Sequence, residues 1–259
     1  MRSIAFINQK GGVGKTTSTA NVGACLATLG KKVLMIDLDP QGNMSMHLGV
    51  NVHGKDLSIY QLICGKKKVT EILAKTEISG LDIIPSDIDL ASAEIELVNT
   101  VGRETIVKFY LDKLVNKYDY VLIDCPPSLG LLTLNALTVA NEIFVPLQTE
   151  FFALQGVSKL LQTFDVIKKR LNSSLEITGI IPCMYDSRTK LGTAVLDKIK
   201  EYFEDKVFTT IIRKNIKLSE APSHGMPIIT YAPDSNGAQD YMALTKEVIA
   251  QEKKILKFK

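Results

Sequence analysis

The sequence predicts an α/β fold, with a doubly wound, mostly parallel sheet flanked by helices on both faces. Short apolar runs alternate along the chain with segments whose apolar residues recur with the helical period. The runs are apolar without interruption, as is typical of parallel strands that are covered on both faces. A glycine-rich loop joins the first run to the first helical segment.

The expected strands are short, continuous and rich in Ile and Val. Runs of this kind favour strands that are buried on both faces of a sheet. They begin close to the N-terminus and continue past residue 200. In chain order they are Ser3–Asn8, Val33–Asp37, Leu81–Pro85, Tyr120–Asp124, Glu142–Pro146, Ile177–Cys183 and Val207–Ile212.

The expected helices lie between these strands and carry apolar stripes. The first stripe consists of Val22, Cys25, Leu26 and Leu29. Gly30 ends that helix because glycine favours a helix C-terminus. Later stripes have the same spacing, at Leu154, Val157, Leu161, Phe164 and Leu171, at Leu191, Val195, Ile199 and Tyr202, and at Tyr241, Leu244 and Val248. No linker-like tract interrupts the alternation, so we expect residues 1–259 to form one domain.

Composition and charge restrict the function classes. Of the 259 residues, 46% are hydrophobic and 23% are charged. A chain of this length and hydrophobic content can bury a core without disulfides or metals. The net charge is only +3, so contact with nucleic acid has to come from a local basic patch. The four cysteines are widely spaced without a C-x-x-C motif, which favours neither a zinc site nor a disulfide framework.

The cellular location is expected to be the cytoplasm. Met1 and Arg2 lead into a short apolar run and then glycines, which does not have the form of a signal peptide. No apolar stretch approaches the ~20 residues that span a bilayer. We therefore expect a soluble cytoplasmic protein.

The most informative segment follows the first expected strand. The spacing fits the phosphate-binding motif G-x-x-x-x-G-K-[ST] when its first glycine is relaxed. The glycines let backbone N–H groups face an anion, Lys15 can reach the β- and γ-phosphates of a nucleotide, and Thr16 can ligate Mg²⁺. The following helix directs its positive dipole end at the same phosphates. The segment comprises Lys10, Gly11, Gly12, Val13, Gly14, Lys15, Thr16 and Thr17.

Aspartates lie at the ends of two expected strands, where ligands bind in open α/β sheets. Asp37 and Asp39 are two residues apart, so both side chains can face the same way. Asp124 follows four apolar residues, as in a Walker B strand whose carboxylate organises Mg²⁺ through water. A strand-end aspartate can also cap a turn. Because these aspartates are expected at the same edge of the sheet as the phosphate loop, a metal site is favoured for Asp39 and Asp124. For Asp37, both a metal site and a turn cap remain open.

The phosphate loop contains one lysine more than the motif needs. Lys10 is either a solvated loop charge or a group that reaches across a dimer interface. The sequence K-G-G-V-G-K-T-T resembles the deviant Walker A loop of the ParA/MinD group of P-loop ATPases, in which the first lysine acts in trans. The resemblance implies that ATP and Mg²⁺ are the cofactors, that ATP closes a homodimer, and that Lys10 binds the nucleotide of the partner subunit.

Two further segments are similar to the switch segments of this family. They read D-L-D-P-Q-G-N from Asp37 and D-C-P-P-S-L-G from Asp124. The resemblance implies that Asp39 acts on the attacking water, while Lys15 and Lys10 complete the catalytic set. Thr16, Asp39 and Asp124 would hold the metal. Asp37 would then lie behind the metal or have a structural role.

The remaining nucleotide contacts are also implied by the resemblance. Residues Pro146–Gly156 are similar to the family segment whose glutamate touches the partner's nucleotide, which is Glu150 here. The alternative for Glu150 is an acid at a helix N-terminus, favoured by the dipole. The family holds adenine through backbone near the positions of Met184 and Arg213. The family usually has proline before the basic pair, where this chain has Ile212.

The segment Lys217–Gly225 resembles the S-E-A-P-S-H-G signature of Soj-type chromosomal partition ATPases. Arg188 lies in M-Y-D-S-R-T, which is also similar to the family. Arg188, Lys214 and Lys217 are the implied contacts to double-stranded DNA without sequence preference, with Lys190 and Arg213 nearby. Each cation alone can be a solvated surface charge. The resemblance further implies a nucleoid-associated protein whose hydrolysis is stimulated by a ParB-like partner with a basic N-terminal segment.

The same scaffold also serves two other functions. A MinD-like ATPase docks on membrane through a basic amphipathic helix, and the tail Glu252–Lys259 is basic with three apolar residues. The tail is short and can equally be a frayed helix end, so we expect no stable membrane association. An iron–sulfur carrier needs paired cysteines at the dimer face, and Cys125 has no partner at the required spacing.

Overall fold

The computed structural model describes residues 1–52, 54–115, 117–150 and 155–255. Within these ranges the strands form a seven-stranded sheet in the order β3-β4-β2-β5-β1-β6-β7. Every pairing is parallel except that of β3 with β4. The strands are β1 (Arg2–Phe6), β2 (Val33–Asp37), β3 (Ala74–Lys75), β4 (Leu81–Ile84), β5 (Tyr120–Asp124), β6 (Glu142–Gln148) and β7 (Glu176–Cys183).

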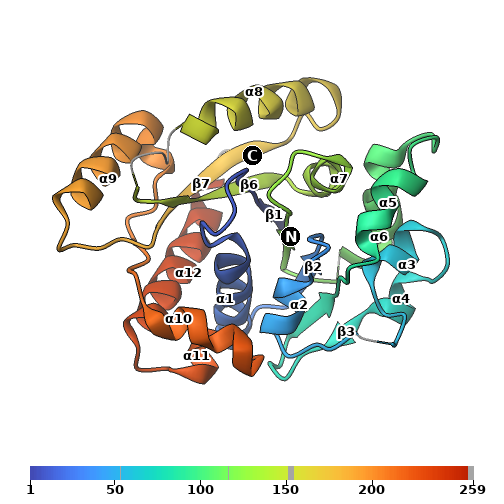
Figure 1. Cartoon of the computed structure of the whole chain (residues 1–259), viewed down its shortest axis with the longest axis horizontal. Helices are drawn as coiled ribbons and strands as arrows, with labels where there is room; N and C mark the ends of the chain where they lie inside the picture. The colour runs from blue at the N-terminus through green and yellow to red at the C-terminus, as the bar shows by residue number, and fades with distance from the viewer. Residues whose placement is uncertain (53, 116, 151–154, 256–259) are drawn as a thin grey trace.

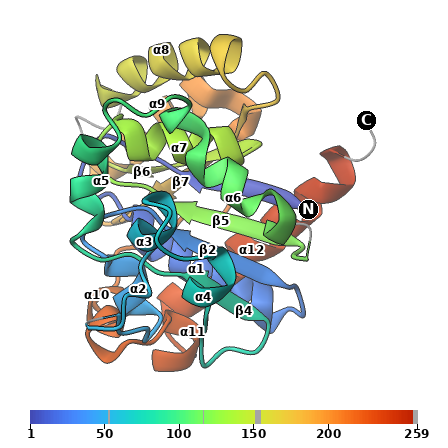
Figure 2. The same ribbon diagram turned by 90° about the vertical axis from the view of Figure 1, so that its right-hand side faces the viewer.

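Helices cover both faces of this sheet (Figures 1 and 2). The helices α1, α2 and α10–α12 lie on one face, and α3–α9 lie on the other. Short 3-10 turns are η1 (Arg103–Thr105), η2 (Glu204–Lys206) and η3 (Ala221–His224). The helices are α1 (Lys15–Thr28), α2 (Asn43–His47), α3 (Ile59–Ile63), α4 (Val69–Ile72), α5 (Leu90–Glu96), α6 (Ile106–Val115), α7 (Leu131–Val139), α8 (Gln155–Arg170), α9 (Lys190–Phe203), α10 (Ile216–Glu220), α11 (Ile228–Tyr231) and α12 (Asn236–Ile255).

The core consists of two apolar clusters, one on each face of the sheet. Successive residues of a strand point to opposite faces, so Ile4 and Phe6 pack into one cluster while Ala5 packs into the other. This is why the central strands are continuous apolar runs rather than alternating ones. The doubly wound, mostly parallel α/β sheet expected from the sequence is confirmed.

The last expected strand, Val207–Ile212, is absent, and the prediction was wrong there. Its contacts with β7 are isolated: Val207 bridges to Ile180, and the N–H groups of Phe208 and Ile212 donate to Ile180 O and Pro182 O at 3.0 and 2.9 Å. Between them, the N–H groups of Thr209 and Thr210 donate to the carboxylate of Glu247 on α12, at 2.9 and 2.7 Å. Glu247 thus takes the backbone donors that a strand ladder needs. The short antiparallel β3 was not expected from the sequence.

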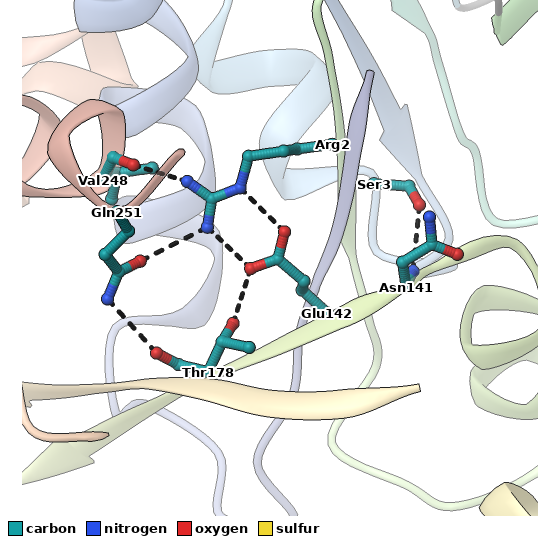
Figure 3. A network of polar contacts seen from close by, with 7 residues as sticks. All are labelled: Arg2, Ser3, Asn141, Glu142, Thr178, Val248 and Gln251. Carbon is teal, nitrogen blue, oxygen red and sulfur yellow. Dashed lines mark hydrogen bonds and ion pairs between the residues drawn. The ribbon is translucent and has the colours of Figure 1, made fainter. Parts of the chain in front are cut away.

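A buried ion pair and the hydrogen bonds around it join the N-terminal strand to β6, β7 and the last helix (Figure 3). The guanidinium of Arg2 on β1 donates to both oxygens of Glu142 on β6, at 2.7 and 2.6 Å, and each side chain is 9% exposed. Arg2 also donates to Val248 O on α12, and Thr178 on β7 donates to Glu142. The network therefore holds three strands and the last helix together.

We expect Glu142→Ala to lower the free energy of unfolding by about 3 kcal/mol or more, because it leaves the Arg2 guanidinium buried without its counter-charge. Urea denaturation followed by circular dichroism measures the change. The matched control is Glu176→Ala, since Glu176 pairs with Lys168 on the surface and is 58% exposed. Equal losses in the two variants would contradict a special role for the buried pair.

Candidate active site

The loop between β1 and α1 is held in a conformation that requires glycine. Gly12 and Gly14 have φ angles of +73° and +94°, which side chains rarely tolerate. Gly14 precedes α1 and has no side chain that could cap the helix. The N–H group of Ser18 donates a hydrogen bond to Gly14 O, at 2.9 Å. The first N–H groups of a helix have no partner within the helix. The loop therefore presents donors and a positive dipole end to one point.

Lys15 is buried at the start of α1. The whole residue is 6% exposed, and its ammonium group donates a hydrogen bond to Lys10 O at 3.3 Å. Burial lowers the pKa of Lys15, and the nearby Asp124 and Asp39 oppose that shift by attracting the charged form. Lys15 thus places a positive charge among the strand-end carboxylates.

The sheet register brings two of these carboxylates side by side. Asp37 and Asp124 are direct register partners at the ends of β2 and β5, and both are fully buried. Asp37 accepts hydrogen bonds from the backbone N–H and the hydroxyl of Ser45 on α2, at 2.9 and 2.8 Å, and from Asp39 N at 3.2 Å. Burial raises the pKa of Asp37 to about 6. These contacts make Asp37 an anchor for α2.

Asp124 is the less satisfied of the two acids. Its Oδ1 accepts a hydrogen bond from Thr19 at 3.4 Å, and its buried Oδ2 has no partner among the described residues. Burial, and then repulsion from Asp37, raises the pKa of Asp124 well above its usual value, while the Thr16 hydroxyl opposes the shift. A buried oxygen without a partner carries a desolvation cost that a cation would remove.

Asp39 occupies the turn after β2. It is 8% exposed, and its Oδ1 accepts a hydrogen bond from Gln41 N at 3.0 Å. Gly42 N donates to the Asp39 carbonyl at 2.9 Å. The position of this carboxylate is thus fixed by its own turn, and changes in that turn would move it.

A cavity of about 490 Å³ lies over these groups. It brings together the glycine loop, the start of α1, the turn after β2 and the end of β7. Among the expected residues, Asp124 and Val13 are buried and do not line it, and Lys10, Glu150 and Arg213 do not line it either. The expected residues that line it are Gly11, Gly12, Gly14, Lys15, Thr16, Thr17, Asp39 and Met184.

Six further residues that line the cavity are not predicted from the sequence as site residues. Pro127 and Pro222 lie in the family-like segments after Asp124 and from Lys217, which are the sequence signal for them. Gln41 and Asn43 belong to the D-L-D-P-Q-G-N segment, whereas His47 carried no signal. The unassigned residues are Gln41, Asn43, Met46, His47, Pro127 and Pro222.

Lys10 and Glu150, the two residues expected to act across a dimer, contact each other. Lys10 Nζ lies 3.2 Å from Glu150 Oε2 and 3.1 Å from Gln148 Oε1. The side chains of Lys10 and Glu150 are 44% and 57% exposed. Lys10 therefore lies on the surface at the rim of its own loop. The rest of the expected motif, residues 151–154, lies outside the described residues.

Met184 and Arg213, expected near adenine, lie at the end of β7. Met184 has a φ of +56°, is 37% exposed and lines the cavity. The backbone of Arg213 bridges to Tyr185, next to Met184. The Arg213 guanidinium instead forms two-pronged contacts with Asp240 on α12, with Nη2 to Oδ1 at 2.6 Å. The Arg213 side chain is thus held by an acid of the same chain, Asp240.

The expected DNA contacts lie on the surface outside the cavity. Arg188 pairs with Asp186 at 2.7 Å and remains 85% exposed. Lys217 on α10 pairs with Glu220 at 2.8 Å, and its ammonium lies 5.8 Å from the ring centre of Tyr231. Lys214 is exposed, and its backbone N–H donates to Tyr185 O, which places it near the Arg188 segment.

His47 supplies a pH test of the packing beside the cavity. It is 1% exposed, neither ring nitrogen has a hydrogen-bond partner among the described residues, and burial lowers its pKa from 6.5 to about 4. Between pH 6.5 and 4, the imidazole of His47 therefore binds a proton more readily in the unfolded chain than in the folded one. The free energy of unfolding falls as the pH falls through that window.

We expect the titration of His47 to lower the free energy of unfolding by roughly 3 kcal/mol as the pH falls from 6.5 to 4. His47→Gln should show a flatter dependence of the urea midpoint on pH than the parent chain. His224→Gln is the control, because His224 is exposed. A His47 variant as acid-sensitive as the parent would contradict the burial of a neutral imidazole.

The chain has close relatives among curated proteins, and a family described as an AAA domain matches residues 1–177. The sporulation initiation inhibitor protein Soj of Bacillus subtilis (strain 168) is 50% identical over 247 residues, which cover 95% of this chain and 98% of the relative. The chromosome-partitioning ATPase Soj of Treponema pallidum (strain Nichols) is 50% identical over 251 residues, covering 97% and 98%.

Solved structures show the same architecture. Cobyrinic acid a,c-diamide synthase from Mycobacterium smegmatis, with bound ADP and magnesium, aligns with a TM-score of 0.85 at 36% identity. The alignment covers 98% of this chain and 96% of that chain. The resemblance read from the loop and switch segments is thereby confirmed, and the chain belongs to the ParA/Soj family of chromosome-partitioning ATPases.

Proposed function

We propose that this chain is a Mg²⁺-dependent ATPase that dimerises on ATP, binds double-stranded DNA without sequence preference and releases it after hydrolysis. A ParB-like partner stimulates that hydrolysis, and the protein associates with the nucleoid in the cytoplasm. The observation that carries the proposal is the cavity in which a glycine loop, a buried lysine and strand-end carboxylates converge. Half of the residues are shared with a chromosome-partitioning ATPase.

The residues fit a nucleotide with Mg²⁺. The glycine loop supplies backbone donors where phosphates would lie, and Lys15 supplies the charge that the β- and γ-phosphates need. The partnerless Oδ2 of Asp124, the Thr16 hydroxyl and Asp39 offer the hard oxygen donors that Mg²⁺ prefers. Among the described residues no three His, Cys, Asp or Glu side chains form a metal group of their own. Mg²⁺ usually takes one or two protein carboxylates together with phosphates and water.

Hydrolysis in such a site depends on positioning and charge. Phosphoryl transfer to water needs an oriented water and neutralised phosphate charge more than a strong base. Mg²⁺ would supply part of that neutralisation when bound. Asp39, at the cavity wall and fixed by its own turn, is proposed to orient the water. Lys15 neutralises the phosphates, and Asp37 holds α2, and with it the turn, in place.

The exposed position of Lys10 supports a role in trans. Its ammonium points to Glu150 and Gln148 on the surface, while Lys15 occupies the buried position in the loop. An exposed ion pair contributes little to stability, so Lys10 can leave Glu150 at small cost. In a two-fold dimer, Lys10 and Glu150 of each subunit are proposed to meet the nucleotide of the other.

We expect Lys10→Ala to bind ATP as a monomer and to fail to dimerise, because it removes the cation that reaches the partner's nucleotide. Lys15→Ala should lose ATP binding or hydrolysis as well as dimers. Gel filtration with light scattering, with and without Mg-ATP, separates the two results. ATP-dependent dimers of the Lys10 variant would overturn the trans role, and unchanged hydrolysis in the Lys15 variant would overturn the phosphate-site assignment.

The surface cations support nonspecific DNA binding. Arg188, Lys214 and Lys217 are exposed, and two of them rest on single acidic neighbours that a phosphate can replace. Lysine lacks the forked donor geometry of arginine, but this difference has little effect where the only contacts are to phosphate. A dimer would present these cations twice on one surface. None of the described helices is long and apolar enough to cross a membrane.

We expect binding to a DNA duplex to require ATP, to ignore sequence and to weaken steeply with salt, at a log–log slope of about 0.9 for each phosphate neutralised. Arg188→Glu and Lys217→Glu should abolish binding while ATP-dependent dimers persist. Lys108→Glu is the control, since it makes the same charge change at an exposed position on α6, outside the segments that carry Arg188 and Lys217. Fluorescence anisotropy at two salt concentrations provides the measurement.

The competing function is a MinD-like ATPase that docks on membrane. Its anchor would be the basic C-terminal tail, of which residues 256–259 lie outside the described residues. Deleting Ile255–Lys259 should leave DNA binding largely unchanged. A chain that needs this tail to bind liposomes, and whose DNA-face substitutions have no effect, would belong to the membrane class instead.

A further inference from the structure

We propose that Lys217, Tyr231 and His224 form a binding site for one backbone phosphate of DNA, with the carboxylate of Glu220 as the competing anion. Lys217 is a DNA contact of the proposed function, whereas the roles of Tyr231, His224 and Glu220 are new. Lys217 lies on α10, His224 ends η3 and Tyr231 ends α11. The inference rests on the proposed function, because it names groups through which that surface binds phosphate.

Two donors from different helices converge on one anionic oxygen. Lys217 Nζ and the hydroxyl of Tyr231 both donate to Oε2 of Glu220, at 2.8 and 3.0 Å. Carboxylate and phosphate oxygens accept the same kind of charge-assisted hydrogen bond. A phosphate oxygen that takes the place of Oε2 therefore meets a cation and a hydroxyl that already point to one position.

His224 adds a third group to this cluster. Its imidazole stacks on the ring of Tyr231, with ring centres 4.8 Å apart and planes 24° from parallel. Hydrogen bonds from Lys217 and Tyr231 lower the pKa of Glu220, and the charge of a protonated His224 acts in the same direction. A protonated His224 is thus a second cation beside the same anion.

The cluster is open to a ligand, and its own anion is weakly held. The side chains of Lys217 and Glu220 are 52% and 39% exposed, and His224 is exposed. An exposed ion pair contributes little to stability, so a phosphate can displace Glu220 at small cost. Tyr231 packs against the apolar cluster on this face of the sheet, which fixes the ring on which His224 stacks.

Protonation of His224 links this site to pH. Histidine is the side chain that ordinarily changes its charge between pH 5 and 8. The charged and titratable groups of the cluster that face this imidazole are Lys217 and Glu220 on α10 and Tyr231 on α11. A bound phosphate adds negative charge beside the ring and favours its protonated form. DNA binding should therefore take up a proton, and the affinity should rise as the pH falls.

Other titratable groups lie near η3, on α2 and in the loops before α3 and after β4. His47 on α2 is buried, and burial lowers its pKa to about 4, so it stays neutral above pH 6. Asp56, Asp87 and Asp89 line a cavity together with part of η3. These four groups are the same in the parent chain and in every variant of the test, so a difference between the chains isolates the cluster.

The test is the binding of a fluorescein-labelled DNA duplex to the full chain with Mg-ATP, measured by fluorescence anisotropy. We expect Glu220→Gln to bind the duplex roughly three-fold more tightly, because the neutral amide keeps the size of the side chain and no longer competes as an anion. The matched control is Glu77→Gln, which removes the same charge at an exposed position in the loop between β3 and β4. Equal tightening in the two variants, or none in Glu220→Gln, would overturn the role of Glu220.

The hydroxyl of Tyr231 is tested by Tyr231→Phe, which keeps the ring that stacks on His224. Because one donor to the phosphate is lost, we expect the duplex to bind roughly three-fold more weakly. Tyr202→Phe is the control, since Tyr202 is an exposed tyrosine on α9. An affinity that Tyr231→Phe leaves unchanged would remove Tyr231 from the site.

The contribution of His224 is measured as a pH dependence. From pH 8 to pH 6, the parent chain should bind the duplex roughly five-fold more tightly, whereas His224→Gln should change far less. Gel filtration with Mg-ATP at each pH checks that the parent and the variants form the same dimers. An equal pH dependence in the parent and in His224→Gln would overturn the contact of His224 with phosphate.

The outcomes separate this site from the proposed function. A parent chain that binds no duplex at either pH would overturn the proposed function, and the site with it. A parent chain that binds the duplex as well as Glu220→Gln, Tyr231→Phe and His224→Gln do at both pH values would overturn the site alone. Inorganic phosphate, added at constant ionic strength, should displace no more duplex than chloride does. Stronger displacement by phosphate would mean that the site takes a free phosphate, and it would overturn the assignment to DNA.

Discussion

The burial of charge at the carboxyl edge of the sheet is the constraint on which the rest of the structure depends. Asp37 and Asp124 are fully buried side by side, Asp39 is almost buried, and Lys15 is the buried cation that faces them. Burying an ionised group is costly unless a counter-charge or hydrogen bonds compensate it. The carboxylates outnumber the lysine, so the protein compensates them in different ways. Ser45 satisfies Asp37, whereas Asp124 keeps an oxygen without a partner among the described residues.

The strand order makes this burial possible. β5 lies between β1 and β2, so the glycine loop after β1 and the acids after β2 and β5 emerge at neighbouring points of one edge. Parallel pairing aligns their C-terminal ends, and helices on both faces exclude water from the strands behind them. The same arrangement attaches α2 to Asp37 and therefore places the turn at Asp39 between the acids and the solvent.

Local patterns in the sequence predicted most of the fold and the chemical centre. Continuous Ile and Val runs identified the strands, and the spacing of Gly14, Lys15 and Thr16 identified the phosphate loop, because both depend on nearby residues alone. Contacts between distant segments were beyond such patterns. Glu247 on α12 takes the donors of Thr209 and Thr210, which removes an expected strand. No local pattern reveals that His47 is buried or that Asp240 binds the Arg213 side chain.

Under the proposed function, the surface cations would be anion-binding groups that the fold keeps ready without a structural cost. Lys10, Arg188 and Lys217 each rest against a nearby acid on the same chain, at 3.2, 2.7 and 2.8 Å. Exposed pairs of this kind add little stability, so an incoming phosphate has little to displace. The local acids also lower the charge that the free surface presents, which restrains binding to stray anions. Phosphates held in a fixed array, by a bound nucleotide or a DNA backbone, can engage several cations together, and an isolated anion cannot. Under the proposed function, an exchange of partners at these three positions would therefore be selective for ordered polyanions.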